Sequence, residues 1–590
     1  MKHLKSVASK YKALIAVFLI VGMAHAFFQS FSARYFQTVV DNFTNLNLTW
    51  ANIAIYGVAL LALYITGYVA EYPWRKLERS IGLSLKLAAL KKLSVIDYLS
   101  YTKLGMGNLI QRIETGSAAG RDILFEFYLR LAGELFPAMI FSIVFVFTIN
   151  QVVMVSILLG YVVVFIISNL LLKALYKIKE RILVNEEKFN HFLVRGFMEM
   201  VVFRINRRFA REINKAESAT KEIIASNVKM KMVHEAFFTI FAILIGIVKI
   251  GIIIYGWQTG NLTVGQIVAL VVLVDNAYQP IAIFNVLYVQ FKLDKIAFAR
   301  YTEFLDAKDD TRLRDAKDNA RLQNADVKDG MRLRDSKNNA QQLQYWLVSG
   351  LSGQVSLTDV GFMYNDREIF KGLNMEIGQG RAVALVGESG SGKSTAVKLM
   401  AGLLQPNNGK VTVDDYDLQE VALNSYYKHI AYLPQEPSIF NGTLRENLVF
   451  DEEAETSLLM QAIQEAELGE LYAKLENGLD TQLGERGISL SGGERQQLAL
   501  ARLWLTSAKI VILDEATSAI DNLTEGAVMK NIMTRLKDKT IIAIAHRLDS
   551  VKSFDNIIVF KDGEIVEEGP FEELLANAQH FHELYHRTQA

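Results

Sequence analysis

The sequence contains no cysteine in its 590 residues, and its formal charge is balanced, with 63 Lys and Arg against 63 Asp and Glu. The lack of cysteine excludes disulfides, thiolate metal sites and cysteine nucleophiles. The lack of net positive charge means that no global basic field argues for a nucleic-acid partner. Apolar residues, by contrast, make up 51% of the chain. This composition indicates a protein that is partly embedded in a membrane and partly soluble.

Six apolar stretches are long enough to cross a hydrocarbon core of about 30 Å as helices. They are residues 13–36, 51–69, 127–149, 152–172, 237–257 and 266–289. The loops 37–50 and 258–265 contain no Lys or Arg, whereas lysines precede the first stretch. Because positive charge stays on the cytoplasmic side, these two loops are predicted to face outward and both termini inward. The long basic connections, residues 75–121 and 173–231, are predicted to be helical cytoplasmic loops.

Two ionisable residues lie within the predicted spans, Lys249 in the fifth and Asp275 in the sixth. They are about equally far from the hairpin turn near Asn261, so they are expected at similar depth. Charged side chains at membrane depth need a partner or water. We therefore expect an ion pair, or a polar cavity shared with Asn276 and Gln279, and favour a structural pair with no ligand role.

Residues 306–343 carry a decaying nine-residue repeat: DAKDDTRLR, DAKDNARLQ, DVKDGMRLR and DSKNNAQQL. Nine residues make two and a half helical turns, so successive copies would face opposite sides of a helix. We therefore expect the repeat to pack into no core and to form a mobile, charged connector; a docking element for a partner is the alternative. The chain is thus predicted to consist of a membrane domain at 1–305, a linker at 306–350 and a third domain at 351–590.

From about Gly353, short β-rich runs alternate with helical sequence, which predicts an α/β domain. The stretch ALVGESGSGKST has the pattern G-x-x-x-x-G-K-S between an apolar run and a helical segment. Its glycines let backbone N–H groups wrap phosphates, Lys393 supplies charge at the β and γ phosphates, and Ser394 offers a hydroxyl to Mg²⁺. The predicted nucleotide-binding loop comprises Gly387, Glu388, Ser389, Gly390, Ser391, Gly392, Lys393, Ser394 and Thr395.

A buried apolar run, IVILDEATSAID, ends in two adjacent carboxylates, Asp514 and Glu515. Adjacent residues on a strand point to opposite faces. Asp514 is therefore expected to reach the metal, while Glu515 acts on the attacking water as general base or orienting group. A merely solvated strand end is the alternative, but it fits poorly with an upstream phosphate loop that needs such a partner.

The stretch LSGGERQQLALARLWL, residues 490–505, resembles the signature sequence of ABC transporters. Two departures from the family pattern are small. Ile520 stands in the D-loop at a position where Leu is usual, and Gln482 stands in the loop before the signature at a position where an acidic residue is common. The other motifs also have counterparts, namely Tyr364 (adenine stacking), Gln435 (the Q-loop glutamine), Asp521 (the D-loop aspartate), His546 (the switch histidine), residues 481–487 (the loop before the signature), and residues 101–116 and 195–212 (the two coupling segments of exporters).

The resemblance implies an exporter-type half-transporter: an all-α, six-helix membrane domain followed by an α/β P-loop ATPase. Such chains work as homodimers or heterodimers, in which ATP and Mg²⁺ lie between Lys393 and Ser394 of one chain and Ser491 and Gly493 of the partner subunit. Hydrolysis then drives alternating access. The implied catalytic residues are Glu515, His546 and Gln435, and the implied metal ligands are Ser394, Gln435 and Asp514.

The implied activity is ATP-driven export of a small amphipathic molecule, peptide or lipid across the plasma or inner membrane, with the ATPase domain in the cytoplasm. Two other functions stay open. Some importers, of the siderophore type, share the exporter fold, and sequence does not separate the two directions. A regulatory subunit gating a partner channel would carry decayed catalytic residues, and here Glu515 and His546 are intact. The six predicted spans exclude a soluble ABC ATPase without transport.

Overall fold

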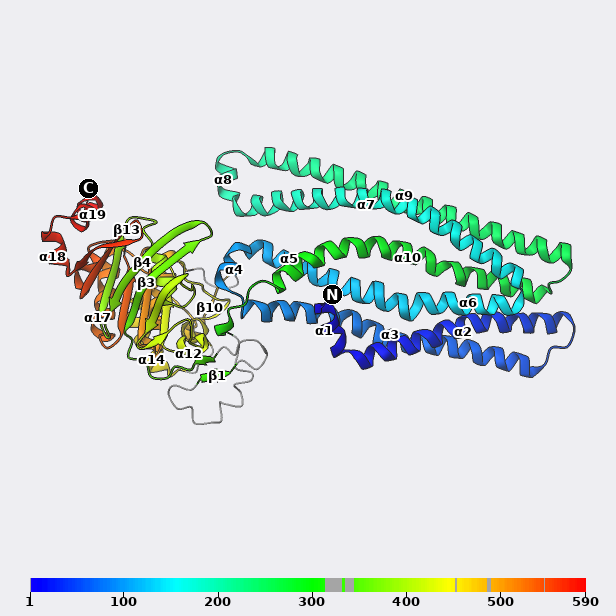
Figure 1. The fold of residues 1–590 in the computed structure, drawn as a ribbon, viewed down its shortest axis with the longest axis horizontal. Coiled ribbons are helices and arrows are strands. Elements are labelled where there is room, and N and C mark those ends of the chain that lie inside the picture. The colour runs from blue at the N-terminus through cyan, green and yellow to red at the C-terminus, as the bar shows by residue number, and fades with distance from the viewer. Residues whose placement is uncertain are drawn as a thin grey trace. The chain divides into compact units, whose positions relative to one another are not determined.

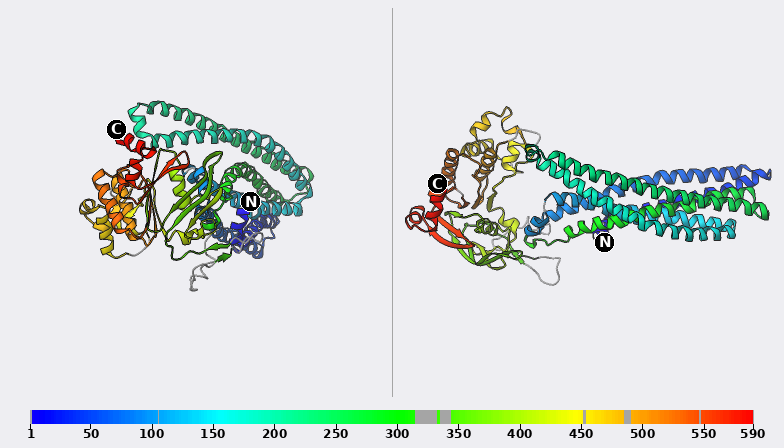
Figure 2. Two further views of the ribbon diagram at one scale, coloured as in Figure 1. Left: turned by 60° about the vertical axis from the view of Figure 1, so that its left-hand side comes forward. Right: turned by 90° about the horizontal axis from the view of Figure 1, so that it is seen from above.

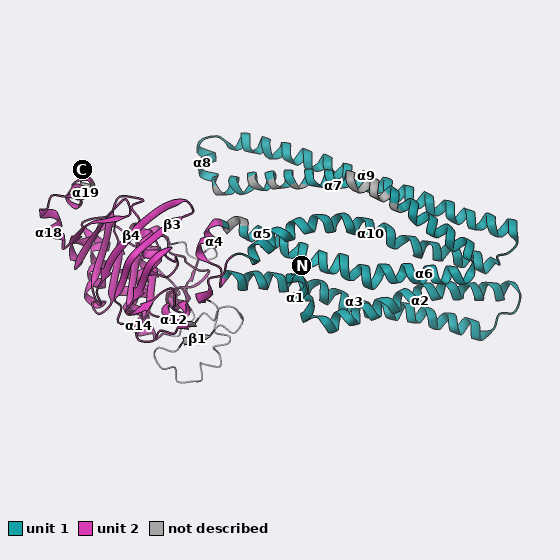
Figure 3. Ribbon diagram, in the orientation of Figure 1, with its two compact units in different colours: residues 1–93, 104–307 teal, residues 94–103, 308–590 magenta. Residues whose placement is uncertain are grey.

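The computed structural model describes residues 2–104, 106–313, 332–334, 344–450, 454–484, 490–545 and 547–589. The chain divides into two compact units (Figure 3). The first comprises Met1–Leu93 and Leu104–Ala307, and the second comprises Ser94–Lys103 and Lys308–Ala590. A short piece of the first long polar connection therefore belongs to the same unit as the C-terminal half of the chain.

The described part of the first unit is built from helices. One of them runs unbroken from Met106 to Ile149 but contains two π-helical segments, η1 and η2, which only Arg130 separates. The elements are α1 (Lys2–Lys10), α2 (Lys12–Thr44), α3 (Trp50–Leu93), α5 (Met106–Asp122), η1 (Ile123–Leu129), η2 (Leu131–Leu135), α6 (Phe136–Ile149), α7 (Gln151–Met198), α8 (Met200–Ile205), α9 (Phe209–Thr259) and α10 (Val264–Leu305).

Five helical stretches in the described chain are long and apolar enough to cross a membrane: Lys12–Thr44, Trp50–Leu93, Leu109–Ile149, Phe209–Thr259 and Val264–Leu305. Each contains one of the predicted spans. The remaining prediction, residues 152–172, lies in α7, whose described apolar part Gln151–Val164 is shorter; several side chains beyond it lie outside the described residues. Most helices extend well past the apolar stretches because the polar connections continue the same helices.

The close approach of α7 and α10 depends on a glycine opposite a tyrosine. α7 and α9 run side by side (Figures 1 and 2), and α10 packs against both. Tyr278 of α10 is fully buried and donates a hydrogen bond to the Ile157 carbonyl oxygen of α7 at 3.1 Å. A Cβ atom at Gly160 would lie 1.9 Å from the Tyr278 hydroxyl. Gly160 therefore allows the contact between α7 and α10, as small residues do between membrane helices.

The ion pair predicted between Lys249 and Asp275 is confirmed. Lys249 Nζ of α9 lies 2.6 Å from Asp275 Oδ2 of α10. Asn276 and Gln279, the other residues of the alternative polar cavity, have different surroundings. Asn276 instead accepts a hydrogen bond from Gln29 at 3.2 Å, and it lines, together with Gln279, a cavity whose described lining does not include Lys249 or Asp275.

The second unit contains two larger sheets. A six-stranded sheet has the order β14-β13-β5-β12-β11-β8, parallel except for β14, and a four-stranded antiparallel sheet has the order β4-β3-β6-β7. The strands are β1 (Arg332–Arg334), β2 (Gln344–Trp346), β3 (Val355–Tyr364), β4 (Arg367–Ile377), β5 (Ala382–Gly387), β6 (Asn408–Val413), β7 (Tyr416–Asp417), β8 (Ile430–Leu433), β9 (Gly442–Thr443), β10 (Gln482–Leu483), β11 (Ile510–Asp514), β12 (Thr540–Ile544), β13 (Asn556–Lys561) and β14 (Glu564–Gly569).

The parallel sheet is buried on both faces, which explains why its strands are almost continuously apolar in sequence. Along β5, Val383 and Leu385 join one hydrophobic cluster, while Ala384 and Val386 join the cluster on the other face. The second unit also contains helices. They are α4 (Tyr98–Leu104, whose last residue belongs to the first unit), α11 (Lys393–Met400), α12 (Leu423–Tyr426), α13 (Leu444–Val449), α14 (Thr456–Glu465), α15 (Gly469–Ala473), α16 (Gly492–Ala501), α17 (Asn522–Arg535), α18 (Phe571–Ala576) and α19 (His580–Gln589).

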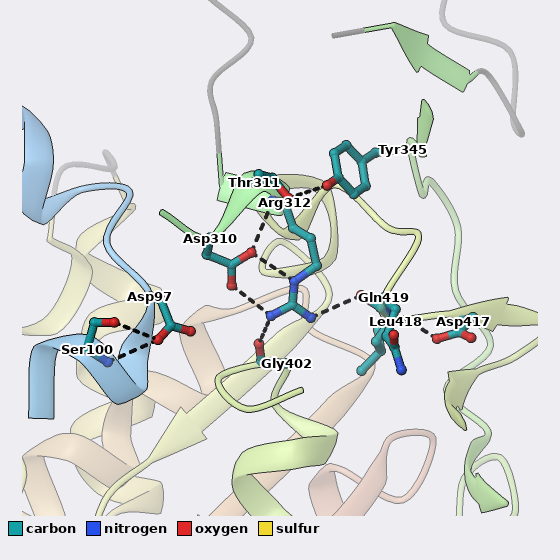
Figure 4. Close-up of polar contacts among 10 residues, drawn as sticks. All are labelled: Asp97, Ser100, Asp310, Thr311, Arg312, Tyr345, Gly402, Asp417, Leu418 and Gln419. Atoms are coloured by element: carbon teal, nitrogen blue, oxygen red, sulfur yellow. Dashed lines mark hydrogen bonds and ion pairs between the residues drawn. The ribbon is translucent and has the colours of Figure 1, made fainter. Parts of the chain in front are cut away.

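The first copy of the nine-residue repeat differs from the expectation that the repeat packs into no core. Arg312 is 3% exposed and donates two hydrogen bonds to the Asp310 carboxylate, at 3.0 and 2.7 Å. It also donates to the carbonyl oxygens of Leu418 and Gly402 (Figure 4). The expectation is wrong for this copy because Arg312 packs as a single side chain from the short 3-10 helix Thr311–Leu313, and no helical stripe is needed. Most of the later copies lie outside the described residues.

Candidate active site

The predicted phosphate loop joins the end of β5 to the start of α11. Gly387 and Gly392 have φ of 144° and 108°, in the region that favours glycine. A Cβ atom at Gly387 would lie 2.2 Å from the Phe560 carbonyl oxygen, and one at Gly392 would lie 2.7 Å from the Phe370 ring. The loop thus requires glycine at both ends, and it leads into the N-terminus of α11, where backbone N–H groups favour anions.

Lys393 lies at the start of α11 and is 5% exposed. Its ammonium group donates hydrogen bonds to the carbonyl oxygens of Gly387 and Glu388, both at 2.8 Å, and to the Ser391 hydroxyl at 3.4 Å. Burial lowers the pKa of Lys393, and the nearby carboxylates of Glu515 and Asp514 oppose that shift. All three acceptors are uncharged, so the site has a buried cation positioned to receive phosphate oxygens.

Asp514 ends β11 and is 8% exposed. Burial raises its pKa, while hydrogen bonds from Tyr432 and Ser394 and the charge of Lys398 counteract the shift. The Tyr432 hydroxyl, from β8, donates to Asp514 Oδ2 at 3.0 Å. The structure therefore brings Asp514 together with Ser394, as predicted. A carboxylate and a hydroxyl are hard oxygen donors of the kind that Mg²⁺ takes.

Glu515 does not follow the predicted strand geometry. β11 ends at Asp514, and Glu515 has φ of 53°, in the left-handed region. The two carboxylates therefore do not point to opposite faces of one strand as predicted, because only Asp514 is on the strand. Instead, the backbone turn directs the Glu515 carboxylate toward Gln435, whose Nε2 donates to it at 2.5 Å. This bond uses the amide nitrogen of Gln435 and leaves its amide oxygen for a metal.

One residue of the site, Gln496, was missed. It is 4% exposed and lies within α16. Its Nε2 donates to the Gln435 carbonyl oxygen and to the Ser518 hydroxyl, both at 3.1 Å, and its Oε1 accepts from the Ala519 backbone at 2.7 Å. Gln496 therefore joins the signature helix to the segments that carry Gln435 and Glu515. A polar residue on the buried side of the predicted signature helix was the available signal.

Ser491 and Asp521 begin helices. The Ser491 side chain caps α16 in a capping box with Glu494. Asp521 caps α17 by accepting from the backbone of Leu523 and Thr524, both at 3.1 Å, and the bond from Thr524 lowers its pKa most. Gly493 has close backbone neighbours, since a Cβ atom there would lie 3.0 Å from the Ala519 carbonyl oxygen. The two signature residues, Ser491 and Gly493, therefore have a structural role in this chain.

Tyr364 ends β3 and packs edge-on against Phe362, with ring centroids 4.9 Å apart. It lines a cavity of about 190 Å³ together with Leu99 and with Thr102 and Lys103, which belong to the first predicted coupling segment. Near the phosphate loop, Arg587 of α19 pairs with Glu388 at 3.2 Å. His546 and residues 485–489 of the predicted loop before the signature lie outside the described residues.

Comparison with known proteins shows what the second unit is similar to. The family model described as ABC transporter matches residues 370–518. An uncharacterised ABC transporter ATP-binding protein of Bacillus subtilis is 32% identical over 358 residues, 60% of this chain and 56% of that protein. An ATP-dependent lipid A-core flippase of Vibrio parahaemolyticus is 38% identical over 248 residues, 41% of this chain and 42% of that protein. The matched segments thus span about half the length of these relatives.

A solved structure extends the likeness to the whole chain. The structure of a bacterial Atm1-family ABC exporter with ATP bound matches with a TM-score of 0.79, covering 99% of both chains at 23% identity. The chain therefore has the fold of an exporter-type ABC half-transporter, a multi-pass membrane domain followed by an ABC nucleotide-binding domain, as the sequence predicted.

Proposed function

We propose that this exporter-type half-transporter hydrolyses Mg-ATP and uses the energy to export a small amphipathic molecule, peptide or lipid by alternating access. The observation that carries the proposal is the convergence of five predicted residues at the end of β11. Asp514 lies with Ser394 and Tyr432, and Glu515 with Gln435, close enough to Lys393 for the charges of both carboxylates to act on its ammonium group. The names of two similar proteins, a flippase and an exporter, support the proposed export direction.

Each described residue has a chemical task in this proposal. Lys393 and the N–H groups of the phosphate loop bind the phosphates. Asp514, Ser394 and the amide oxygen of Gln435 would hold Mg²⁺, which when bound neutralises charge on the phosphates. Glu515 orients the attacking water or accepts its proton, and Gln435 holds the Glu515 carboxylate in place. Tyr364 would stack on adenine, Asp521 and His546 complete the family's set, and the remaining loop residues, Ser389, Gly390 and Thr395, contribute backbone donors.

The proposal includes a dimer in the plasma or inner membrane, with both termini and the ATPase domain in the cytoplasm. Ser491 and Gly493 would close over ATP held by the second copy or by a related half-transporter. Because Glu515, Gln435 and Lys393 are all present in this chain, a homodimer would have two complete sites. The domain boundaries 1–305, 306–350 and 351–590 remain part of this proposal.

The test is ATP hydrolysis by the full chain reconstituted in lipid. Glu515→Gln should lower the rate by about 100-fold or more while ATP binding persists, because it removes the group that acts on water. Glu476→Gln, an exposed glutamate of the same unit, is the matched control and should hydrolyse ATP at the wild-type rate. Hydrolysis that survives Glu515→Gln, or its loss in both variants, would contradict the proposed site.

A further inference from the structure

The first unit contains a cavity of about 640 Å³ between α2, α3, α10 and the helix that comprises η1, η2 and α6. Its described lining is unusual in charge: four glutamates, Glu71, Glu78, Glu126 and Glu134, but one cationic side chain, Arg75. Polar side chains of His25, Gln29, Asn276 and Gln279 complete the polar part of the wall. A space of this size in a membrane domain is large enough for a small organic molecule.

The four glutamates are arranged around two arginines. Arg75 lies 2.7 Å from Glu71 and 3.8 Å from Glu78. Arg130, behind the lining, lies 3.2 Å from Glu126 and 2.9 Å from Glu134. Each group of one arginine and two glutamates has a net charge of −1. Arg121 also acts on Glu78 and Glu126, but it forms a neutral pair with Asp122 at 2.7 Å, so the charged groups around the cavity have an excess of two negative charges. By the predicted spans, Arg130 and Glu134 lie at membrane depth, while the other four charged residues lie at the cytoplasmic end of the helices. Charge at membrane depth is costly and marks ion or substrate sites.

The remaining wall is aromatic and apolar. Trp74 lies 5.9 Å from Phe18 and 5.1 Å from Phe125, measured between ring centroids, and the Arg130 guanidinium lies 5.3 Å from the Trp74 ring. Phe18, Leu135 and Ile283 also face the cavity. Aromatic faces attract cations through the ring quadrupole. The wall therefore offers apolar surface for the body of a ligand next to carboxylates for its charge.

A second observation, independent of charge, points to the same place. Glu126 lies in η1 and Glu134 in η2, and Arg130 is the residue between these two π-helical segments. π-helical turns are rare and are found frequently at functional sites. Here, η1 carries Glu126, η2 carries Glu134, and Arg130 lies between the two segments. The irregular part of the Met106–Ile149 helix thus coincides with the charged wall.

We propose that this cavity binds a lipophilic organic cation, which names the substrate class of the transporter and so rests on the proposed function. The excess carboxylate charge selects a positive group, and Trp74 with its apolar neighbours takes the hydrophobic body. An anion of the same shape meets the same apolar wall but is repelled by the carboxylates. The glutamates are positioning and binding groups of the transport step, and they have no part in ATP hydrolysis.

The probe pair is tetraphenylphosphonium and tetraphenylborate, two ions of the same shape and opposite charge. Binding to the full chain in detergent micelles is measured by equilibrium dialysis against empty micelles. We expect the cation to bind at least about tenfold more tightly than the anion, a difference of about 1.4 kcal/mol. Equal binding of the two ions, or tighter binding of the anion, overturns the proposal.

Variants locate the binding. Glu78→Gln with Glu134→Gln removes one carboxylate from each charged group and leaves both groups neutral, so the dissociation constant of the cation should rise by about tenfold or more. Glu71→Gln with Glu126→Gln does the same with the other two carboxylates, so the test survives if one pair fails to fold. The matched control, Glu217→Gln with Glu222→Gln, changes the same charge at exposed positions of α9. Unchanged cation affinity in both cavity pairs, or equal loss in the control, overturns the assignment.

The binding assay contains no ATP, which separates this inference from the proposed function. Selective cation binding in a chain that does not hydrolyse ATP would leave the cavity assignment intact and contradict the proposed function. Hydrolysis that depends on Glu515, without selective cation binding, would support the proposed function and contradict the cavity assignment.

Discussion

Arg312 in the nucleotide-binding unit and Arg130 in the membrane unit both lie against carboxylates, but their surroundings differ. The Arg312 side chain is 2% exposed, faces one carboxylate and two carbonyl oxygens, and belongs to a neutral pair. The Arg130 side chain is 24% exposed and faces two carboxylates, which leaves an excess negative charge. Full burial is tolerated where charge and hydrogen bonds balance. Excess charge persists only where water or a ligand can reach it.

The largest effect is expected where the neutral pair is broken. Arg312→Ala leaves Asp310 buried without its partner, which costs about 3–5 kcal/mol and should lower the melting temperature of the full chain in detergent by roughly 10 °C. Arg75→Ala, which removes an exposed arginine beside the cavity, should melt close to wild type. Equal destabilisation by the two changes would show that exposure does not govern the cost.

Lys393 is a third case, a buried cation whose hydrogen-bond acceptors are uncharged. Lys393→Ala should lower the rate of ATP hydrolysis by about 100-fold or more, because a preorganised donor to the phosphates is lost. Lys410→Ala, an exposed lysine of β6 in the same unit, is the control and should retain most of the rate. Steady-state hydrolysis at saturating ATP distinguishes the two; comparable losses would mean that phosphate binding by Lys393 is not the cause.

Tyr432 tests whether the hydrogen bond to Asp514 positions the metal ligand. Tyr432→Phe keeps the ring but removes the 3.0 Å bond, and loss of a bond to a charged group costs about 1.5–3 kcal/mol. The Mg²⁺ concentration for half-maximal hydrolysis should rise by about tenfold, with a small change in the ATP concentration for half-maximal rate. A fall in rate without any shift in Mg²⁺ dependence would assign Tyr432 a structural role alone.

The smallest effect is expected for the ion pair of Lys249 and Asp275. Its charged atoms lie close together, but about half of the Asp275 side chain is exposed. A double-mutant cycle with Lys249→Ala and Asp275→Ala, measured by thermal unfolding, should give a coupling energy of about 1 kcal/mol or less. The swapped pair, Lys249→Asp with Asp275→Lys, should restore the stability that the single changes remove. Independent losses without rescue would contradict a functional pairing.

The sequence by itself determined the order of parts and most of the nucleotide site. Gly387, Lys393 and Ser394 lie within eight residues of one another, so a single loop fixes their geometry. Five of the predicted spans and the pairing of Lys249 with Asp275 were also readable, because helix length and distance from a hairpin turn are local properties. The resemblance to ABC transporters rested on several motifs that occur together in the order typical of that family.

Only the tertiary structure decided the rest, and the reason is distance along the chain. The left-handed backbone of Glu515 and the three bonds of Gln496 depend on where β11 ends and on segments up to 61 residues apart. The buried Arg312 escaped the periodicity argument because its partners, at Gly402 and Leu418, lie in another part of the fold. The charged cavity draws its glutamates from separate helices, and a net charge shared between helices has no signature in any single stretch of sequence.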